Sequence, residues 1–318
     1  MKTLFFLICC CLALPLYAQK DSLNKPDTVW RTGGGVGFDF SSLTLINPRI
    51  GAGSNRIGLG GLGNIFANYK QGKVQWTNLA SLQLSAQRIG GSDQPYQKNL
   101  DVLRGTSRLG FRSTSKKIYY ATELDVQTLL LETYENNLLR PRTDERLRAR
   151  FLSPITVSFS PGLDYTPNKR WSFFYSPVGF KMIYVANDSI AALDVHGNDL
   201  GEDGVYQPGE NEQINLGSNV RIVYNDTYLG ERMAYTSNLN LFSNYLENPQ
   251  FVDVLWVNNV NLKIFNGLGL EMVYELFFDR DVMVQFDANK NGVFEDGELA
   301  TRPSHTLAFL LKYNYLFK

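Results

Sequence analysis

The chain alternates apolar and polar residues in about a dozen segments between Trp30 and Phe317, and this rhythm constrains its fold more than any other feature. In the segment 73-89, one face of an extended strand would carry Val74, Trp76, Ala80, Leu82, Leu84 and Ala86. The other face would carry Gln75, Thr77, Ser81, Gln83, Ser85 and Gln87. One face therefore suits hydrocarbon and the other suits water.

The connections between these segments alternate between brief and long. We predict strands near 30-45, 56-70, 73-89, 100-112, 117-132, 149-165, 170-186, 212-225, 231-245, 251-265, 268-280 and 303-317. The connections after even-numbered strands are short turns, and those after odd-numbered strands are long, except 246-250. Short turns on the periplasmic rim and long loops on the extracellular rim are typical of an outer-membrane barrel.

The fold class that we predict is all-β, a closed antiparallel transmembrane β-barrel of 12 strands, with 10 or 14 strands as alternatives. No segment after the N-terminal region offers the run of about 18 apolar residues that a spanning helix needs. A closed barrel is the other form that satisfies its backbone hydrogen bonds within a bilayer. The competing interpretation is a soluble protein with an amphipathic edge strand. It does not explain why short and long connections alternate along the chain.

Residues 1-18 read as a signal peptide, with basic Lys2, an apolar run from Leu4 to Leu14, and a cleavage site after Ala18. We expect 19-29 to be a short periplasmic segment and 30-318 to be the barrel with long extracellular loops. The three cysteines all lie within the signal, so the exported chain would contain none. The predicted location is the bacterial outer membrane.

Aromatic residues gather beside the predicted periplasmic turns, as in an interfacial girdle: Trp30, Tyr69, Trp76, Phe111, Tyr120, Tyr165, Trp171 and Phe173. The last segment alternates apolar residues up to Phe317, which resembles the C-terminal signal read by the barrel-assembly machinery. Lysine plus arginine equals aspartate plus glutamate at 31 each, so a nucleic-acid partner is not expected. The expected surroundings are outer-membrane lipid and lipopolysaccharide, and the sequence names no protein partner.

The sharpest chemical motif is the stretch 287-298, DANKNGVFEDGE, which matches the calcium-loop pattern at every constrained position. The predicted ligands are Asp287, Asn289, Asn291, the carbonyl of Val293, Glu295 and a bidentate Glu298. The flanking sequence is not helical, so this would be a lone Ca²⁺ loop, with an affinity of about 0.1 to 1 mM. The alternative is an acidic, solvated hairpin loop.

A less complete match to the calcium-loop pattern lies at 199-210, where Gly201 occupies the position of a ligand. Both stretches fall on predicted outer loops. If they bind calcium, stiffening of these loops is the expected role.

The sequence offers few candidate catalytic residues. The two histidines are His196, in an acidic loop, and His305, at the start of the last strand. Ser304 adjoins His305, but neighbouring strand residues point to opposite faces, so the two side chains would not act together. No catalytic or organic cofactor residues are predicted.

The inward faces predict ion pairs along the lumen wall. If the strands 100-112 and 117-132 pair through the turn at 113-116, Arg104 lies opposite Asp125 and Arg108 lies diagonal to Glu123. Such pairs would cross-link the wall and would not create a pore of a single charge sign.

Several motifs resemble a porin-like outer-membrane β-barrel family of Gram-negative bacteria that is known as a domain of unknown function. They are FLSP at 151-154, LDYTPNKRWSFFYSP at 163-177, NLNLFSNYLENPQFVDVLWVNNVNLKI at 238-264, LTLINP at 43-48 and GKVQWTNLASL at 72-82. The family's acidic YDDD-like run is reduced here to Phe278, Asp279, Arg280 and Asp281. The resemblance implies an outer-membrane barrel and no activity, and the calcium-like loop is not part of it.

Three functions follow as hypotheses. The main one is passive passage of small solutes or a structural surface role, without an enzymatic step. The alternative is a closed barrel that acts as a calcium-stiffened binding or assembly partner at the cell surface. The third, an outer-membrane lipid hydrolase, would depend on His305.

Overall fold

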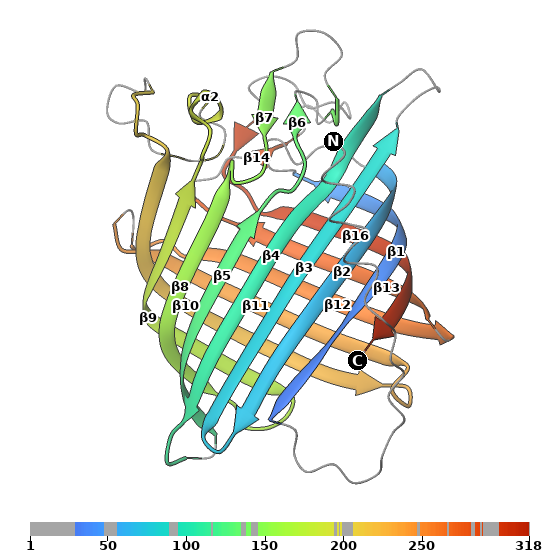
Figure 1. The fold of residues 1–318 in the computed structure, drawn as a ribbon, viewed down its shortest axis with the longest axis vertical. Coiled ribbons are helices and arrows are strands. Elements are labelled where there is room, and N and C mark those ends of the chain that lie inside the picture. The colour runs from blue at the N-terminus through green and yellow to red at the C-terminus, as the bar shows by residue number, and fades with distance from the viewer. Residues whose placement is uncertain are drawn as a thin grey trace.

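The computed structural model describes residues 29–47, 56–88, 95–115, 117–134, 138–140, 146–193, 196, 198, 206–246, 249–265, 267–280, 284–286, 288 and 299–317. Its main body is a closed antiparallel barrel of 12 strands (Figure 1). The strands are β1 (Trp30–Ile46), β2 (Arg56–Gln71), β3 (Val74–Arg88), β4 (Tyr96–Arg112), β5 (Ile118–Thr128), β8 (Ile155–Tyr165), β9 (Trp171–Tyr184), β10 (Glu212–Tyr228), β11 (Met233–Asn244), β12 (Asp253–Phe265), β13 (Leu268–Phe278) and β16 (Ser304–Phe317). The predicted fold class and strand number are confirmed.

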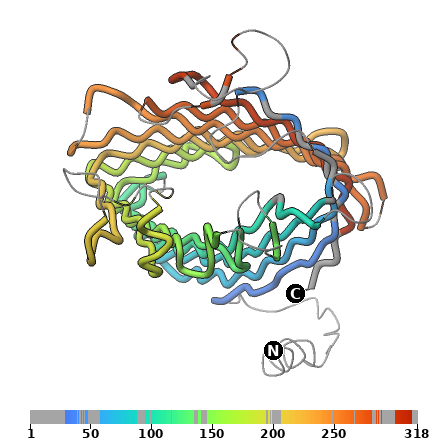
Figure 2. The backbone as a smooth tube through the Cα atoms, turned by 90° about the horizontal axis from the view of Figure 1, so that it is seen from above, coloured from blue at the N-terminus to red at the C-terminus, as the bar shows by residue number. Residues whose placement is uncertain are grey.

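Each barrel strand pairs with the next one along the chain, and β1 closes the barrel against β16. Because the strand number is even, β1 begins and β16 ends at the same rim, which we call the short-turn rim (Figure 1). The opposite rim carries the long connections and is called the long-loop rim. From above, the wall encloses an oval lumen (Figure 2).

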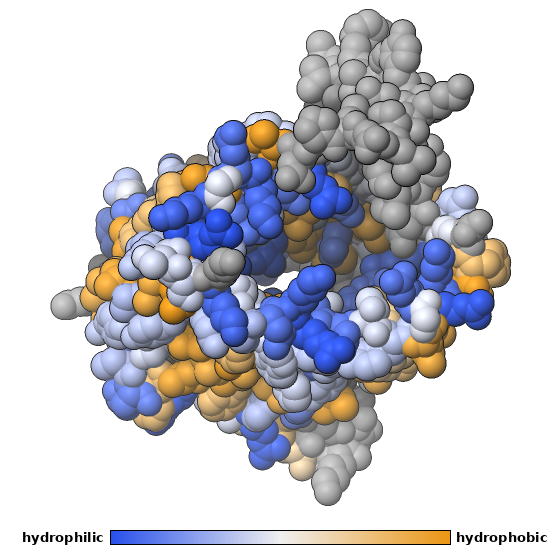
Figure 3. Space-filling view, turned by 90° about the horizontal axis from the view of Figure 1, so that it is seen from below, coloured by the Kyte–Doolittle hydropathy of each residue, from blue (hydrophilic) through white to orange (hydrophobic). Residues whose placement is uncertain are grey.

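Strand alternation places apolar side chains on the outside of the wall. Phe38, Leu59 and Tyr120 all lie within barrel strands, and their side chains are 73%, 68% and 61% exposed. Exposure of large apolar groups over a whole closed sheet is what a hydrocarbon environment requires. The view from below shows apolar residues around the outside and hydrophilic residues around a central opening (Figure 3).

The aromatic girdle follows the short-turn rim across neighbouring strands. The Trp30 ring lies 5.1 Å from that of Tyr69 and 5.8 Å from that of Trp76, and the Trp171 ring stacks 5.7 Å from that of Phe173. Tyr224 of β10 extends the row, with its ring 4.8 Å from that of Trp171. The girdle is confirmed at the rim where it was predicted.

Two long connections at the long-loop rim pack together into a cap. The residues are those of β6 (Thr133–Tyr134), β7 (Leu147–Ala149) and the short helix α2 (Asp188–Ala191), elements that the sequence did not predict. Val185, Ile190 and Ala191 form its small core, with Leu147 packed against them. The Ala186 amide donates to the Leu152 carbonyl at 3.0 Å, so the two connections are also joined through their backbones.

A second pair of short strands, β14 (Val284–Gln285) and β15 (Leu299–Ala300), is antiparallel and lies in the last long connection. Among the described residues, no helix is long and apolar enough to cross a membrane. The predicted signal peptide lies outside the described residues.

Candidate functional site

The most distinctive chemistry on the described part of the chain is a group of charged side chains on the lumen wall, where β4, β5, β8 and β10 curve together. Arg104 and Arg108 lie four residues apart in β4 and so share its inward face. Their carboxylate neighbours come from β5 and β8, and Arg221 comes from β10. We call this set the lumen charge cluster: Arg104, Arg108, Glu123, Asp125, Asp164 and Arg221.

Three ion pairs connect the lumen charge cluster. Arg104 Nε lies 2.7 Å from Asp125 Oδ2, and Arg108 Nη2 lies 2.6 Å from Asp164 Oδ2. Arg221 binds the Glu123 carboxylate with both Nη atoms, the Nη2 to Oε2 distance being 2.6 Å. Because β10 and β5 are separated by two other strands, this third pair ties distant parts of the wall together.

The predicted register of these strands was wrong by two residues. Arg108 lies directly opposite Glu123, and Arg104 lies opposite Gln127, because the Ser113 amide donates to the Ile118 carbonyl and the turn therefore begins one residue later than predicted. Arg104 still reaches Asp125 diagonally, so that predicted pair is confirmed. Arg108 pairs with Asp164 instead of the nearer strand's carboxylate.

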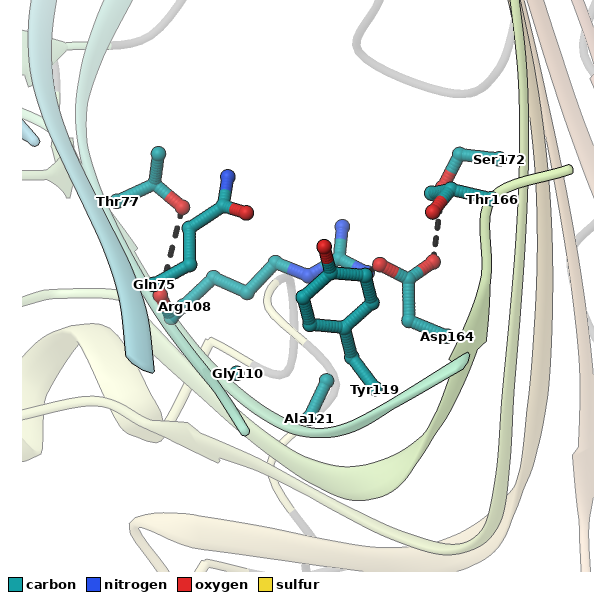
Figure 4. A pocket seen from close by; sticks show the side chains of 9 residues that line it. All are labelled: Gln75, Thr77, Arg108, Gly110, Tyr119, Ala121, Asp164, Thr166 and Ser172. Carbon is teal, nitrogen blue, oxygen red and sulfur yellow. Dashed lines mark hydrogen bonds and ion pairs between the residues drawn. The ribbon is translucent and has the colours of Figure 1, made fainter. Parts of the chain in front are cut away.

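The Phe174 ring of β9 contacts two arginines of the cluster. It is only 2% exposed, and the guanidinium carbons of Arg108 and Arg221 each lie 5.3 Å from its ring centroid. Cation–π contacts of this kind hold a guanidinium in place. The Asp164 carboxylate also accepts a 2.9 Å hydrogen bond from Ser172 Oγ, so both ends of the Arg108 pair are positioned (Figure 4).

The cluster borders a cavity of about 600 Å³ within the lumen. Its other lining residues are mostly polar, with an apolar patch of Phe66, Leu79 and Val223. A smaller cavity of about 320 Å³ shares Thr77, Arg108 and Ser172 with it, and Figure 4 shows Arg108 reaching across this space toward Asp164. The wall therefore surrounds solvent-filled space and is not packed shut at this level.

The other side of the barrel also presents polar groups to the lumen. Glu271 of β13 is 6% exposed and contacts both Lys312 Nζ and the side-chain amide of Asn259. Glu271 and Lys312 thus form an ion pair on this side of the lumen.

The predicted calcium ligands Asp287, Asn289, Asn291, Val293, Glu295 and Glu298 lie outside the described residues. Within the described ranges, no three His, Cys, Asp or Glu side chains are placed to hold a metal ion. At the weaker motif, Glu210 Oε2 accepts a 2.6 Å hydrogen bond from the Gln207 amide. That carboxylate is thus engaged in a local turn.

The two histidines belong to different elements and have different hydrogen-bond partners. His305 lies on the outer face of β16, where its Nδ1 is 2.9 Å from the Tyr274 hydroxyl. Ser304 is 4% exposed and alternates to the other face, as predicted. His196 belongs to the cap and donates from Nε2 to the Arg148 carbonyl at 2.7 Å.

Sequence reasoning missed Arg221, Asp164 and Phe174. Arg221 occupies the inward parity of β10, between Asn219 and Val223, so strand alternation could have placed it in the lumen. Its distance from Glu123 along the chain, 98 residues, gave no local signal of the pair.

A closed antiparallel wall with an apolar exterior, an aromatic girdle and a polar lumen defines an outer-membrane β-barrel. Residues 43–134 match the model of a family described as a protein of unknown function (DUF3078). The match includes the motifs at 43-48 and 72-82, and it confirms the predicted resemblance to a family of unknown function. No curated protein is significantly similar to the chain.

Several solved barrels are similar in structure at low sequence identity. The COG4313 outer membrane channel from Pseudomonas putida F1 is 9% identical, with 94% of this chain and 100% of that chain covered and a TM-score of 0.44. The translocator domain of the autotransporter NalP from Neisseria meningitidis is 6% identical, with 92% and 91% covered and a TM-score of 0.38. The Pseudomonas putida toluene transporter TodX is 10% identical, with 91% and 90% covered and a TM-score of 0.32.

Proposed function

We propose that this protein is a porin-like channel of the Gram-negative outer membrane that passes small polar solutes by diffusion. The observation that carries the proposal is the hydrophilic, hollow lumen enclosed by a complete wall (Figure 3). Water in such a lumen replaces the hydration that a polar solute would lose in the bilayer. The paired charges of the wall favour wetting without a strong single-sign barrier.

Cysteine accessibility tests this proposal, because the chain has no cysteine beyond residue 11. Thr106 lines the lumen cavity, whereas Thr122 lies on the outer face of β5, opposite Leu109. In planar bilayers, a charged, membrane-impermeant thiol reagent is expected to lower the single-channel conductance of Thr106→Cys and to leave Thr122→Cys unchanged. A correctly folded protein that gives no conductance would refute the channel.

A binding or assembly role at the cell surface is the second candidate, and the cap is the observation that favours it. Its hydrophobic core and backbone bonds give the long-loop rim a defined surface, with Val185 and Ala191 fully buried. Calcium held by 287-298 would add to this order. An electrically silent barrel with an intact cap would support this role over the channel.

We propose no chemical step. The outward His305 and the inward Ser304 cannot approach one substrate bond together, which weighs against a lipid hydrolase. Release of lysolipid from outer-membrane lipids that disappears in His305→Ala would overturn this part of the proposal.

A further inference from the structure

We propose that the lumen cavity binds small organic anions with an apolar body, such as aromatic carboxylates. This inference rests on the proposed channel function and deepens it, since it names the class of solute that the lumen favours. It depends on two features of the same wall, one electrostatic and one apolar.

The electrostatic feature is an unequal exposure within the ion pairs. The three pairs of the lumen charge cluster sum to zero, but the Arg104 side chain is 51% exposed and its partner Asp125 only 20%. For Arg108 and Asp164 the exposed fractions are 25% and 12%. In the third pair the fractions are nearly equal, 17% for Arg221 and 20% for Glu123. The charge that a solute meets at the cluster is therefore positive on balance, and it is greatest at Arg104.

Arg104 also has the geometry to hold a carboxylate. Its contact with Asp125 uses the Nε atom, and the half-exposed guanidinium lines the cavity. A guanidinium presents several N–H donors in one plane, which suits two parallel bonds to a carboxylate. A cationic solute has no equally exposed partner in the cluster, because none of its three carboxylates is more than 20% exposed.

The apolar feature is a patch beside Arg104. Phe66 and Leu79 lie opposite each other on β2 and β3, and they remain 36% and 43% exposed on the wall of the cavity. Leu79 lies opposite Thr106, so Arg104 and Arg108 flank it diagonally, one on each side. An apolar solute body placed on this patch would remove it from water while the anionic group reaches Arg104.

The two features select for a combined ligand. Acetate would bind the Arg104 guanidinium but leave the apolar patch exposed to water. Benzyl alcohol would cover the patch but would not neutralise the charge of Arg104. Benzoate can do both, so we expect it to bind more tightly than either probe.

Equilibrium dialysis of labelled benzoate against the detergent-folded protein tests the site without requiring conduction. Arg104→Gln is expected to weaken binding about tenfold or more, the usual loss for a charged hydrogen bond. Leu79→Thr should also weaken benzoate binding, while leaving acetate binding unchanged. The matched control is Lys181→Gln, which removes a positive charge from β9 at a position that does not line the cavity.

Each outcome has one meaning. Tighter binding of benzoate than of acetate and benzyl alcohol, lost in Arg104→Gln and kept in Lys181→Gln, would establish the site. No benzoate binding above that of detergent alone, or equal binding by both charge variants, would overturn it. Planar-bilayer recordings decide the channel separately, because a conducting barrel that binds no benzoate refutes only the anion site.

Discussion

Single residues decide how closely the strands approach one another. At Gly162 of β8, an added Cβ atom would lie 2.2 Å from the Tyr175 carbonyl oxygen and 2.9 Å from Ser176 Cα, both backbone atoms of β9. The register of β8 against β9 shifts at this point, so the two backbones come unusually near. Only glycine fits this contact without moving a strand.

Gly162→Ala is therefore expected to destabilise the barrel by about 1–3 kcal/mol, the usual cost of overpacking. The measurement is urea unfolding of the refolded protein in lipid vesicles. Gly105→Ala is the control, because a Cβ atom there would meet nothing within 4 Å. Equal stability of the two variants would contradict the close approach of β8 and β9.

At the scale of elements, the cap is held by contacts between two connections that are distant in the chain. His196 makes one of these contacts, through its hydrogen bond to the carbonyl of Arg148 in β7. Burial lowers the pKa of His196 below its ordinary value of 6.5, and the hydrogen bond opposes this only in part. The folded cap thus prefers the neutral imidazole.

The sign of the pH dependence follows from this pKa. Below pH 6.5 the imidazole of an opened cap takes up a proton more readily than that of the closed cap, so the closed form loses stability as the pH falls. We expect faster amide hydrogen exchange in 185–193 at about pH 5.5 than at about pH 7.5, after correction for intrinsic rates. His196→Gln should reduce this difference, since glutamine can donate the same bond without titrating. An unchanged pH dependence in that variant would exclude His196 as its source.

The calcium loop is a second prediction at this scale. It connects β14 and β15, whose antiparallel pairing brings the two ends of the loop together. If 287-298 binds Ca²⁺, millimolar calcium should protect residues 281-302 from proteolysis, and Glu298→Gln should abolish that protection by removing the bidentate ligand. Magnesium serves as the control cation, because it prefers a smaller, octahedral site. Equal protection of wild type and variant would refute the assignment.

For the whole molecule, the apolar outer face and the polar inner face of the barrel predict how the protein behaves in water. The exposed apolar side chains cover the outside of the barrel, so water is a poor solvent for it. We expect the protein to aggregate when detergent is removed and to remain a monodisperse species in micelles, as measured by size exclusion with light scattering. A stable monomer in plain buffer would contradict a membrane location.

The sequence alone determined the strands, their number and their two faces. Alternation in segments such as 73-89 is a local property, because neighbouring side chains of any strand point to opposite sides. The aromatic girdle was predictable for the same reason, since each member lies beside a short turn. The small elements of the cap were not, because packing between distant loops outweighs weak local propensity in β6, β7 and α2.

The tertiary structure decided which charged groups meet. The sequence placed Arg104 and Arg108 in the lumen, but a turn that begins one residue later changed their register. The curvature of the wall then brought Arg108 to Asp164 and Arg221 to Glu123. Such pairs depend on strand stagger and on barrel closure, which bring together residues from strands that do not adjoin in the sheet. The exposed guanidinium of Arg104 beside Phe66 and Leu79 arises in the same way, because three strands must be in register before the patch and the charge share one cavity.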